Sequence, residues 1–348
     1  MYFEQLREKD ASILNLIVEL YLRTGKPVSS GTIAQKSKKY SVSSATVRNI
    51  MAGLEKEGFL FQPHTSSGRI PTDNGLRLYV KQVIENVVFA DQVNQFFSED
   101  MTSQSGDFNS LLMNISKILS EYTDNIGFVI SPKLSHINFR NIRLIKISEN
   151  RVMVILVTTQ NLVLTEIVET SYYFTQRELD RATHYINFNF SGKNLYFVRD
   201  FILKELPRYR SDYEDIINRL TVFLKEYLKQ EETESKVFLE GTAKLFEKVE
   251  FLDPRLMHSM FEKFEQKAKL AKLLSDFISL DRVKVLIGSE LNLPDLPNCS
   301  LVLSHYGYEN KTLGSLGIIG PRRIPYKKII PLVDSVAKRL SSTISNKQ

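Results

Sequence analysis

Cysteine is almost absent from the 348-residue sequence, which contains only Cys299. A single cysteine excludes an internal disulfide and a zinc site built from several cysteines, and we interpret it as a packed thiol rather than a nucleophile. No apolar run reaches the ~18 residues of a membrane span. The N-terminus begins with polar and acidic residues and lacks the layout of a signal peptide. These absences predict a cytoplasmic protein without a membrane segment.

The patterns that usually carry enzyme chemistry are also missing. His136, His184, His258 and His305 are scattered through the sequence without the spacing of metal ligands. No G-x-S-x-G nucleophile motif is present, and no group of residues combines a nucleophile with a base. We therefore expect no enzyme activity, no metal and no cofactor.

One loop, QPHTSSGRIPT at Gln62–Thr72, combines a histidine, two serines and an arginine. A phosphate-binding loop requires several glycines and a lysine at fixed spacing, but this loop has one glycine, Gly68, and no lysine. A serine nucleophile is also disfavoured, because His64 lies too close along a hairpin to be aimed at the hydroxyl of Ser66 or Ser67. A solvated hairpin and a basic hairpin that contacts a large partner remain open from the loop alone.

Positive charge is concentrated at the start of the chain. The whole sequence has 46 basic and 40 acidic residues, a net charge of +6. Residues 1–80 contain 11 basic and 7 acidic side chains, whereas residues 171–280 contain 18 of each. This distribution is compatible with contact between the N-terminal quarter and a polyanion. The length predicts two or three domains.

The N-terminal quarter has the element order of a winged helix-turn-helix. The apolar spacing and the turn residues predict helices at residues 4–24, after Ser29 or Ser30, and at 43–57, strands at 59–61 and 69–70, and a further helix from about residue 72. Ser43 has the position of an N-cap, and Gly58 that of a C-terminal stop. Three helices followed by a β-hairpin predict a DNA-binding domain in residues 1–90.

The third helix has an unusual outer face. Its apolar stripe contains Val47, Ile50, Met51 and Leu54, and the opposite side carries short residues with a few polar ones between them. Alanines allow a helix to enter the major groove closely, asparagine can pair with adenine, and arginine can contact guanine or phosphate. The candidate recognition-helix residues are Ser43, Ser44, Ala45, Thr46, Arg48, Asn49 and Lys56.

The loop after this helix then becomes a candidate wing. Hydroxyl groups and backbone amides can donate to phosphate oxygens, and arginine can enter a minor groove. We expect glycine to permit the backbone conformation at the tip. The candidate wing residues are His64, Thr65, Ser66, Ser67, Gly68 and Arg69.

The rest of the chain predicts an α+β multidomain protein. A polar linker is expected at residues 91–107, then a helix at about 108–123, strand-like segments up to residue 170, a mainly helical block at 171–280, and strands followed by a helix at 281–348. One sheet-containing domain interrupted by an insertion fits this pattern, as do two consecutive domains. The basic pairs Arg322-Arg323 and Lys327-Lys328 have the charge to bind nucleic acid, but we expect them to be solvated residues beside a strand end and on a helix.

Two stretches resemble a known family. SSATVRNIMAGLEKEGFLFQPHTSSGRIPTDNGLRLYV at Ser43–Val80 and GSLGIIGPRRIPYKKIIPLVD near the C-terminus are similar to the HrcA family of heat-inducible transcription repressors. The resemblance implies an N-terminal winged helix and a GAF-like α/β domain in two parts, residues 108–170 and 281–348. It also implies that residues 171–280 form an inserted dimerisation domain.

The same resemblance implies a function and partners. A homodimer would repress chaperone operons by binding an inverted-repeat operator in double-stranded DNA. The chaperonin GroEL would keep the repressor active until heat-damaged clients occupy the chaperonin. A regulator controlled by a small ligand in the GAF-like domain is the alternative, because such domains often bind ligands.

Overall fold

A computed structural model describes most of the chain. The described residues are 6–36, 42–65, 67–86, 107–132, 137–160, 162–170, 172–204, 236–247, 283–291, 298–308 and 311–345. Helices and strands both contribute, as the α+β prediction requires. No helix among these residues is long and apolar enough to cross a membrane.

Residues 8–86 form an N-terminal unit of four helices and one strand pair. The elements are α1 (Glu8–Thr24), α2 (Ser30–Lys36), α3 (Ser44–Lys56), β1 (Leu60–Phe61), β2 (Ile70–Pro71) and α4 (Asp73–Asn86). The strands pair antiparallel, with Leu60 opposite Pro71. The predicted order of three helices, a hairpin and a further helix is confirmed.

Local signals in the sequence explain where these helices begin and end. The Ser43 side chain accepts a hydrogen bond from the Thr46 amide at 3.1 Å, which confirms the predicted N-cap of α3. Gly25 has φ +67° and donates its amide to the Tyr21 carbonyl at 2.8 Å, so it closes α1. Gly58 has φ +80°, which suits the chain reversal after α3.

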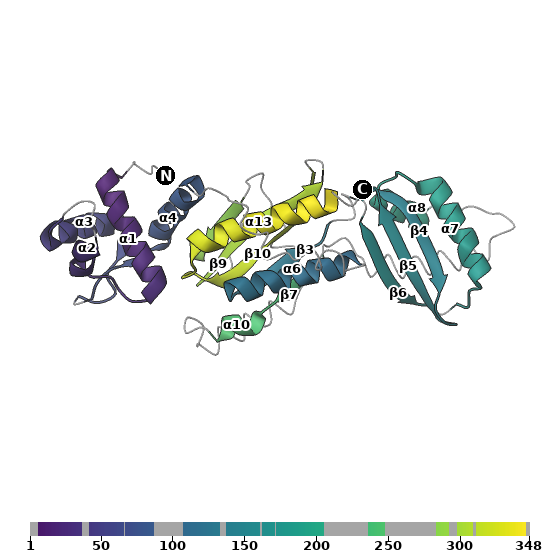
Figure 1. The fold of residues 1–348 in the computed structure, drawn as a ribbon, viewed down its shortest axis with the longest axis horizontal. Coiled ribbons are helices and arrows are strands. Elements are labelled where there is room, and N and C mark those ends of the chain that lie inside the picture. Colours follow the sequence, from purple (N-terminus) through teal and green to yellow (C-terminus); the bar gives the residue numbers. More distant parts are fainter. Residues whose placement is uncertain are drawn as a thin grey trace.

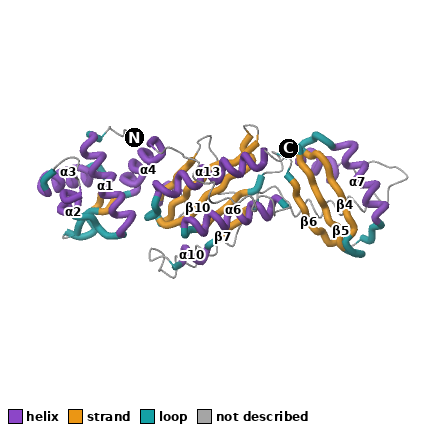
Figure 2. The backbone as a smooth tube through the Cα atoms, in the orientation of Figure 1, coloured by secondary structure: helices purple, strands orange, loops and turns teal. Residues whose placement is uncertain are grey.

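A central unit contains a five-stranded antiparallel sheet. Its strands are β3 (Ile126–Ile130), β7 (Val237–Glu240), β8 (Val283–Ile287), β9 (Cys299–Tyr308) and β10 (Lys311–Pro321), in the order β7-β3-β10-β9-β8. The helices α6 (Phe108–Thr123) and α13 (Tyr326–Ser345) pack on one face. Figure 2 shows both helices along that sheet. Two short helices, α10 (Thr242–Phe246) and η5 (Gly288–Leu291), follow β7 and β8.

Residues 137–204 form an inserted unit with a separate core. Three antiparallel strands, β4 (Phe139–Lys146), β5 (Arg151–Thr158) and β6 (Val163–Glu169), are followed by the helices α7 (Gln176–Phe190) and α8 (Leu195–Lys204). Leu144, Val154 and Leu156 on the sheet share a buried cluster with Leu179 and Ile186 of α7. The capping box between Thr175 and Glu178 fixes the start of α7.

The position of this inserted unit corrects the predicted boundary at residue 170. Strands β4 to β6 do not join the five-stranded sheet, and they pack with α7, which the sequence pattern placed in the next domain. Conversely, β7 lies within the predicted insertion 171–280 but pairs with β3 of the central sheet. The interruption therefore falls between β3 and β7. The apolar alternation of a strand shows that one of its faces is buried, but not which sheet it joins.

The three units follow one another along the longest axis of the molecule (Figure 1). The N-terminal unit lies at one end, the central unit in the middle and the inserted unit at the other end. Much of the contact between the first two is made by α4, which packs against β8 and α13, and α1 adds an ion pair between Glu19 and Lys327. These contacts hold the N-terminal unit against the central unit.

Cys299 provides a test of the packing in the central sheet. The residue is fully buried in β9, and burial raises the pKa of its thiol to about 12. Because the thiolate is the reactive form, we predict that iodoacetamide at about pH 8 leaves the folded protein unmodified and alkylates the guanidinium-unfolded protein completely. Mass spectrometry measures both. Alkylation of the folded protein at the rate of a free cysteine would contradict this packing.

Candidate nucleic-acid interface

The two faces of α3 are divided as the sequence predicts. Val47, Met51 and Leu54 are buried at 0–2% exposure, and α3 contacts α1, α2 and β1. The residues that are exposed on this helix and just before it are Ser43, Ala45, Thr46, Arg48, Asn49, Ala52, Gly53 and Lys56. The helix thus presents a surface of short side chains from which one arginine, one asparagine and one lysine project.

The start of α3 is held by hydroxyl groups. Besides capping the Thr46 amide, the Ser43 hydroxyl lies 2.9 Å from the Thr46 hydroxyl. The half-buried Ser44 lies 3.2 Å, hydroxyl to hydroxyl, from Ser30 of α2. These contacts fix the approach of α2 to α3. They also show that Ser43 and Ser44 support the helix even before any partner binds.

The loop between β1 and β2 is organised by its own hydrogen bonds. The Gln62 side-chain amide donates to the carbonyls of Thr65 and Ser67, at 3.0 Å each. The Ser67 hydroxyl donates to the His64 carbonyl at 2.7 Å. His64 and Thr65 are exposed, while Ser66 lies outside the described residues. Gln62 was not among the predicted site residues, although it shapes the loop that carries them.

Arg69 is placed differently from the free cation that the sequence led us to expect. Its Nε donates to the Glu55 carboxylate of α3 at 2.8 Å, and its side chain is only 15% exposed. Its backbone forms a reciprocal bridge with Val28, at 2.9 Å in both directions. Arg69 therefore connects the loop to α3 and to the segment before α2. Sequence reasoning missed Glu55, because its role depends on an ion pair across 14 positions.

Gly68 is required for a reason other than the predicted one. Its φ is not positive, so the turn conformation does not demand glycine. Instead, a Cβ at this position would lie 2.4 Å from the carbonyl oxygen of Val28 and 2.5 Å from its carbonyl carbon. Close approach between two backbone segments is the physical requirement. The glycine allows the Val28–Arg69 bridge to form.

Arg322 and Lys327, one residue from each C-terminal basic pair, form ion pairs within the molecule. Arg322 forms an ion pair with Asp73 of α4 at 2.7 Å, and Lys327 forms one with Glu19 of α1. The expectation that both pairs are solvated is therefore wrong for Arg322, whose side chain is 32% exposed, whereas Lys327 and Lys328 are exposed as expected. Among the described residues, no group of three or more histidine, cysteine, aspartate or glutamate side chains is arranged to hold a metal ion.

Two glycines provide a matched test of the loop. Gly68→Ala should lower the free energy of unfolding by about 1–3 kcal/mol, because the new methyl group must displace the backbone of Val28. Gly53 lies on the exposed side of α3, where a Cβ would meet no atom within 4 Å. Gly53→Ala should therefore raise the free energy of unfolding by about 0.5–1 kcal/mol, because alanine favours a helix more than glycine does. Chemical denaturation of the whole chain measures both. Equal effects of the two substitutions would contradict the close approach.

Comparison with known proteins shows which family this chain resembles. Residues 109–330 match the family model described as HrcA protein C terminal domain. A protein named heat-inducible transcription repressor HrcA from Geobacter sulfurreducens is 34% identical, over 97% of this chain and 97% of its own. Its namesake from Syntrophobacter fumaroxidans is also 34% identical, with the same coverage of both chains.

Further comparisons agree with this match. The protein of the same name from Clostridium perfringens strain 13 is 34% identical, over 98% of this chain and 99% of its own. A solved crystal structure of a hypothetical protein has a TM-score of 0.72 at 22% identity and covers 99% of this chain and 100% of that one. That similarity concerns the fold alone. The curated relatives, alike over almost their whole length, and the family model together show that this chain belongs to the HrcA family.

Proposed function

We propose that the protein is a heat-inducible transcription repressor that acts as a homodimer in the cytoplasm and has no enzyme activity. Its N-terminal unit is a winged helix-turn-helix that binds an inverted-repeat operator in double-stranded DNA. The relatives bear the name of such repressors. The observation that carries the proposal in this chain is the outer face of α3, which is exposed, short and polar beside a hairpin.

In this proposal α3 is the recognition helix. Ala45 and Ala52 are exposed and short, so the helix can lie close to the floor of the major groove. Arg48 and Asn49 are exposed on the same side, and their side chains have the donors and acceptors that recognise guanine and adenine edges. Ser43, Ser44, Thr46 and Lys56 lie at the two ends of the helix, where contact with phosphates is expected.

The hairpin loop is the wing. His64 and Thr65 are exposed, and with Ser66 they are proposed to contact the DNA backbone. Ser67, Gly68 and Arg69 have contacts that shape the wing and attach it to α3. A wing held in this way loses little conformational freedom when it binds, which favours affinity.

The inserted unit is proposed to mediate dimerisation. Of the exposed large hydrophobic side chains in the described ranges, most belong to residues 137–204: Ile147, Ile167, Tyr172, Tyr173, Tyr185, Phe188, Tyr196 and Phe197. We propose that these side chains form one apolar surface, because a contiguous exposed apolar surface marks a protein interface. An inverted-repeat operator requires two recognition helices related by a two-fold axis, which a homodimer supplies.

The central unit is proposed to be the GAF-like domain, and the chaperonin GroEL is proposed to keep the repressor active. Both proposals follow from membership of the family. In the part of the chain that the structure describes, no observation favours a small-ligand site in the central unit over control by the chaperonin. The regulator controlled by a small ligand therefore stays the alternative.

Asn49 provides the direct test of base recognition. Asn49→Ala should weaken binding to the operator by about 1–3 kcal/mol and relax the preference at one base position. Fluorescence anisotropy with the operator, single-base variants and scrambled DNA measures this. The side chain is exposed, so the fold should be unaffected. Equal loss of affinity on operator and scrambled DNA would show that Asn49 contacts the backbone instead.

Two exposed aromatics provide a test of the dimer surface. Phe188 and Phe197 are 82% and 51% exposed. Changing both to aspartate places charges in the proposed apolar interface, so the light-scattering mass should fall from dimer to monomer. Met113→Asp, at a residue of α6 that is 51% exposed, serves as the control and should leave the mass unchanged. A dimeric mass for the double variant would contradict this interface.

A further inference from the structure

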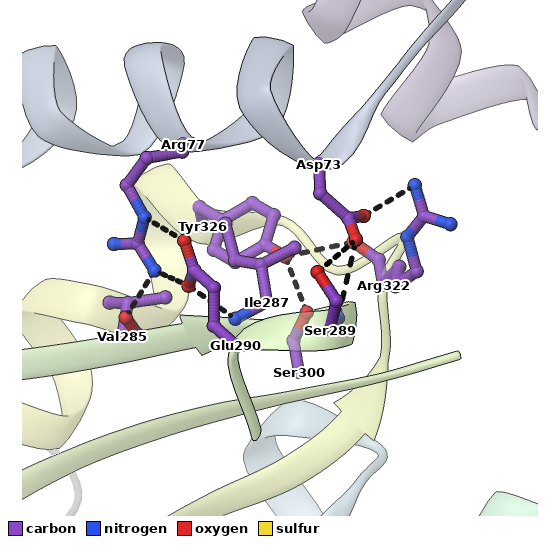
Figure 3. Close-up of polar contacts among 9 residues, drawn as sticks. All are labelled: Asp73, Arg77, Val285, Ile287, Ser289, Glu290, Ser300, Arg322 and Tyr326. Atoms are coloured by element: carbon purple, nitrogen blue, oxygen red, sulfur yellow. Dashed lines mark hydrogen bonds and ion pairs between the residues drawn. The ribbon is translucent and has the colours of Figure 1, made fainter. Parts of the chain in front are cut away.

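The helix α4 is attached to the central unit by a bidentate ion pair between Arg77 and Glu290. Nε of Arg77 donates to one carboxylate oxygen of Glu290 at 2.7 Å, and its Nη2 donates to the other oxygen and to the Val285 carbonyl, the latter at 2.6 Å. The carboxylate of Glu290 also accepts from the Ile287 amide at 2.9 Å. Figure 3 shows Arg77 reaching from α4 to these groups. Paired parallel hydrogen bonds fix the relative orientation of the two groups as well as their distance.

A second ion pair anchors the first residue of the same helix. The Asp73 carboxylate lies 2.7 Å from Nη2 of Arg322 and accepts from the amide and hydroxyl of Ser289, at 3.3 and 3.2 Å. Tyr326 supports the Arg322 segment by donating its hydroxyl to the Arg322 carbonyl at 2.9 Å. The two ion pairs hold α4 at Asp73 and Arg77, which are four positions apart, or about one helical turn. Figure 3 shows both residues on α4.

Gly288 brings the two units into close approach. Its φ is +53°, and a Cβ at this position would lie 2.5 Å from a carboxylate oxygen of Asp73. The start of α4 therefore rests directly on the central backbone. The Glu19–Lys327 ion pair adds a contact from α1. We call Asp73, Arg77, Glu290 and Arg322, together with Gly288, the α4 joint.

The charged groups of the α4 joint are partly withdrawn from water. Their side chains are 26–32% exposed. Burial lowers the pKa of the Arg77 guanidinium from its ordinary value, while the neighbouring Tyr326 raises it. The Coulombic attraction within a half-buried ion pair is stronger than within an exposed one, and loss of one partner leaves the other charge desolvated and unpaired. The buried apolar cluster also continues from the N-terminal unit into the central unit, so directional polar contacts supplement apolar packing.

None of the proposed DNA-contacting residues takes part in the α4 joint. The exposed residues of α3 and of the wing are separate from the groups that join α4 to β8 and to the segment before α13. The α4 joint therefore lies between the part that contacts DNA and the part that carries the proposed dimer surface. In a symmetric dimer, the separation and angle of the two recognition helices depend on such a connection.

We propose that the α4 joint sets the half-site spacing that the repressor accepts, with Asp73, Arg77, Glu290 and Arg322 as positioning residues. This inference rests on the proposed function. A rigid joint holds both recognition helices at one separation, whereas a loosened joint allows several. Each added base pair rotates one half-site relative to the other by about 34–36°, so a rigid dimer discriminates strongly between spacers.

The experiment uses the full-length protein and a series of inverted repeats whose spacer changes by one base pair at a time. The double variant Asp73→Asn/Arg77→Gln removes one charge of each sign, so the net charge that attracts DNA is unchanged. We expect wild-type affinity to fall by about tenfold or more away from the preferred spacer. In the double variant we expect the affinity away from the preferred spacer to fall by about threefold or less. Binding to a single half-site should be unchanged.

A matched control lies on the same helix. Lys81 and Glu85 form an exposed ion pair, with side chains 68% and 57% exposed. The double variant Lys81→Gln/Glu85→Gln also removes one charge of each sign but leaves the α4 joint intact. It should keep the wild-type dependence on spacer length. Gly288→Ala introduces a methyl group against Asp73 without removing a charge, and it should flatten the dependence as the α4 joint variant does.

The outcomes separate this inference from the proposed function. A wild-type spacer dependence in both Asp73→Asn/Arg77→Gln and Gly288→Ala would overturn the inference while leaving the repressor proposal in place. Equal flattening in the Lys81→Gln/Glu85→Gln control would also overturn it. If the wild-type protein does not prefer inverted repeats to scrambled DNA, the proposed function itself fails.

Discussion

The burial of one side of α3 is the interaction on which the rest of the interface depends. Val47, Met51 and Leu54 are withdrawn almost completely from water, and each such side chain contributes about 1.5–3 kcal/mol when it is fully buried. This stripe fixes the rotation of the helix about its own axis. Because side chains on a helix are spaced at ~100°, that rotation also decides that Arg48 and Asn49 point outward.

Polar contacts fix the orientation of the elements that apolar packing brings together. The Glu55–Arg69 pair holds the hairpin against α3, and the α4 joint holds the N-terminal unit against the central unit. Apolar surfaces tolerate small rotations, whereas bidentate hydrogen bonds depend on angle. A protein that must present two helices at a defined separation benefits from both kinds of contact. In the proposed repressor, Arg322 near the C-terminus acts on DNA binding by positioning α4 through its ion pair with Asp73.

Local patterns were sufficient to predict the N-terminal unit. The N-cap at Ser43 and the apolar spacing of α3 depend only on neighbouring residues, so the sequence shows them directly. Contacts between distant segments were not predictable in this way. The Arg77–Glu290 pair joins residues 213 positions apart, and the pairing of β7 with β3 crosses the whole inserted unit. The role of Gly68 was wrongly explained for the same reason, since its neighbour Val28 is remote in the chain.

The most direct measurement is the affinity of the wild-type protein for an inverted-repeat operator and for scrambled DNA over a series of salt concentrations, with and without GroEL. We predict a strong preference for the operator, a gain in binding with the chaperonin, and a steep loss of affinity as salt rises, because phosphate contacts release counterions. Salt-sensitive binding of equal strength to both DNAs, with no effect of the chaperonin, would contradict the proposal that α3 recognises an operator.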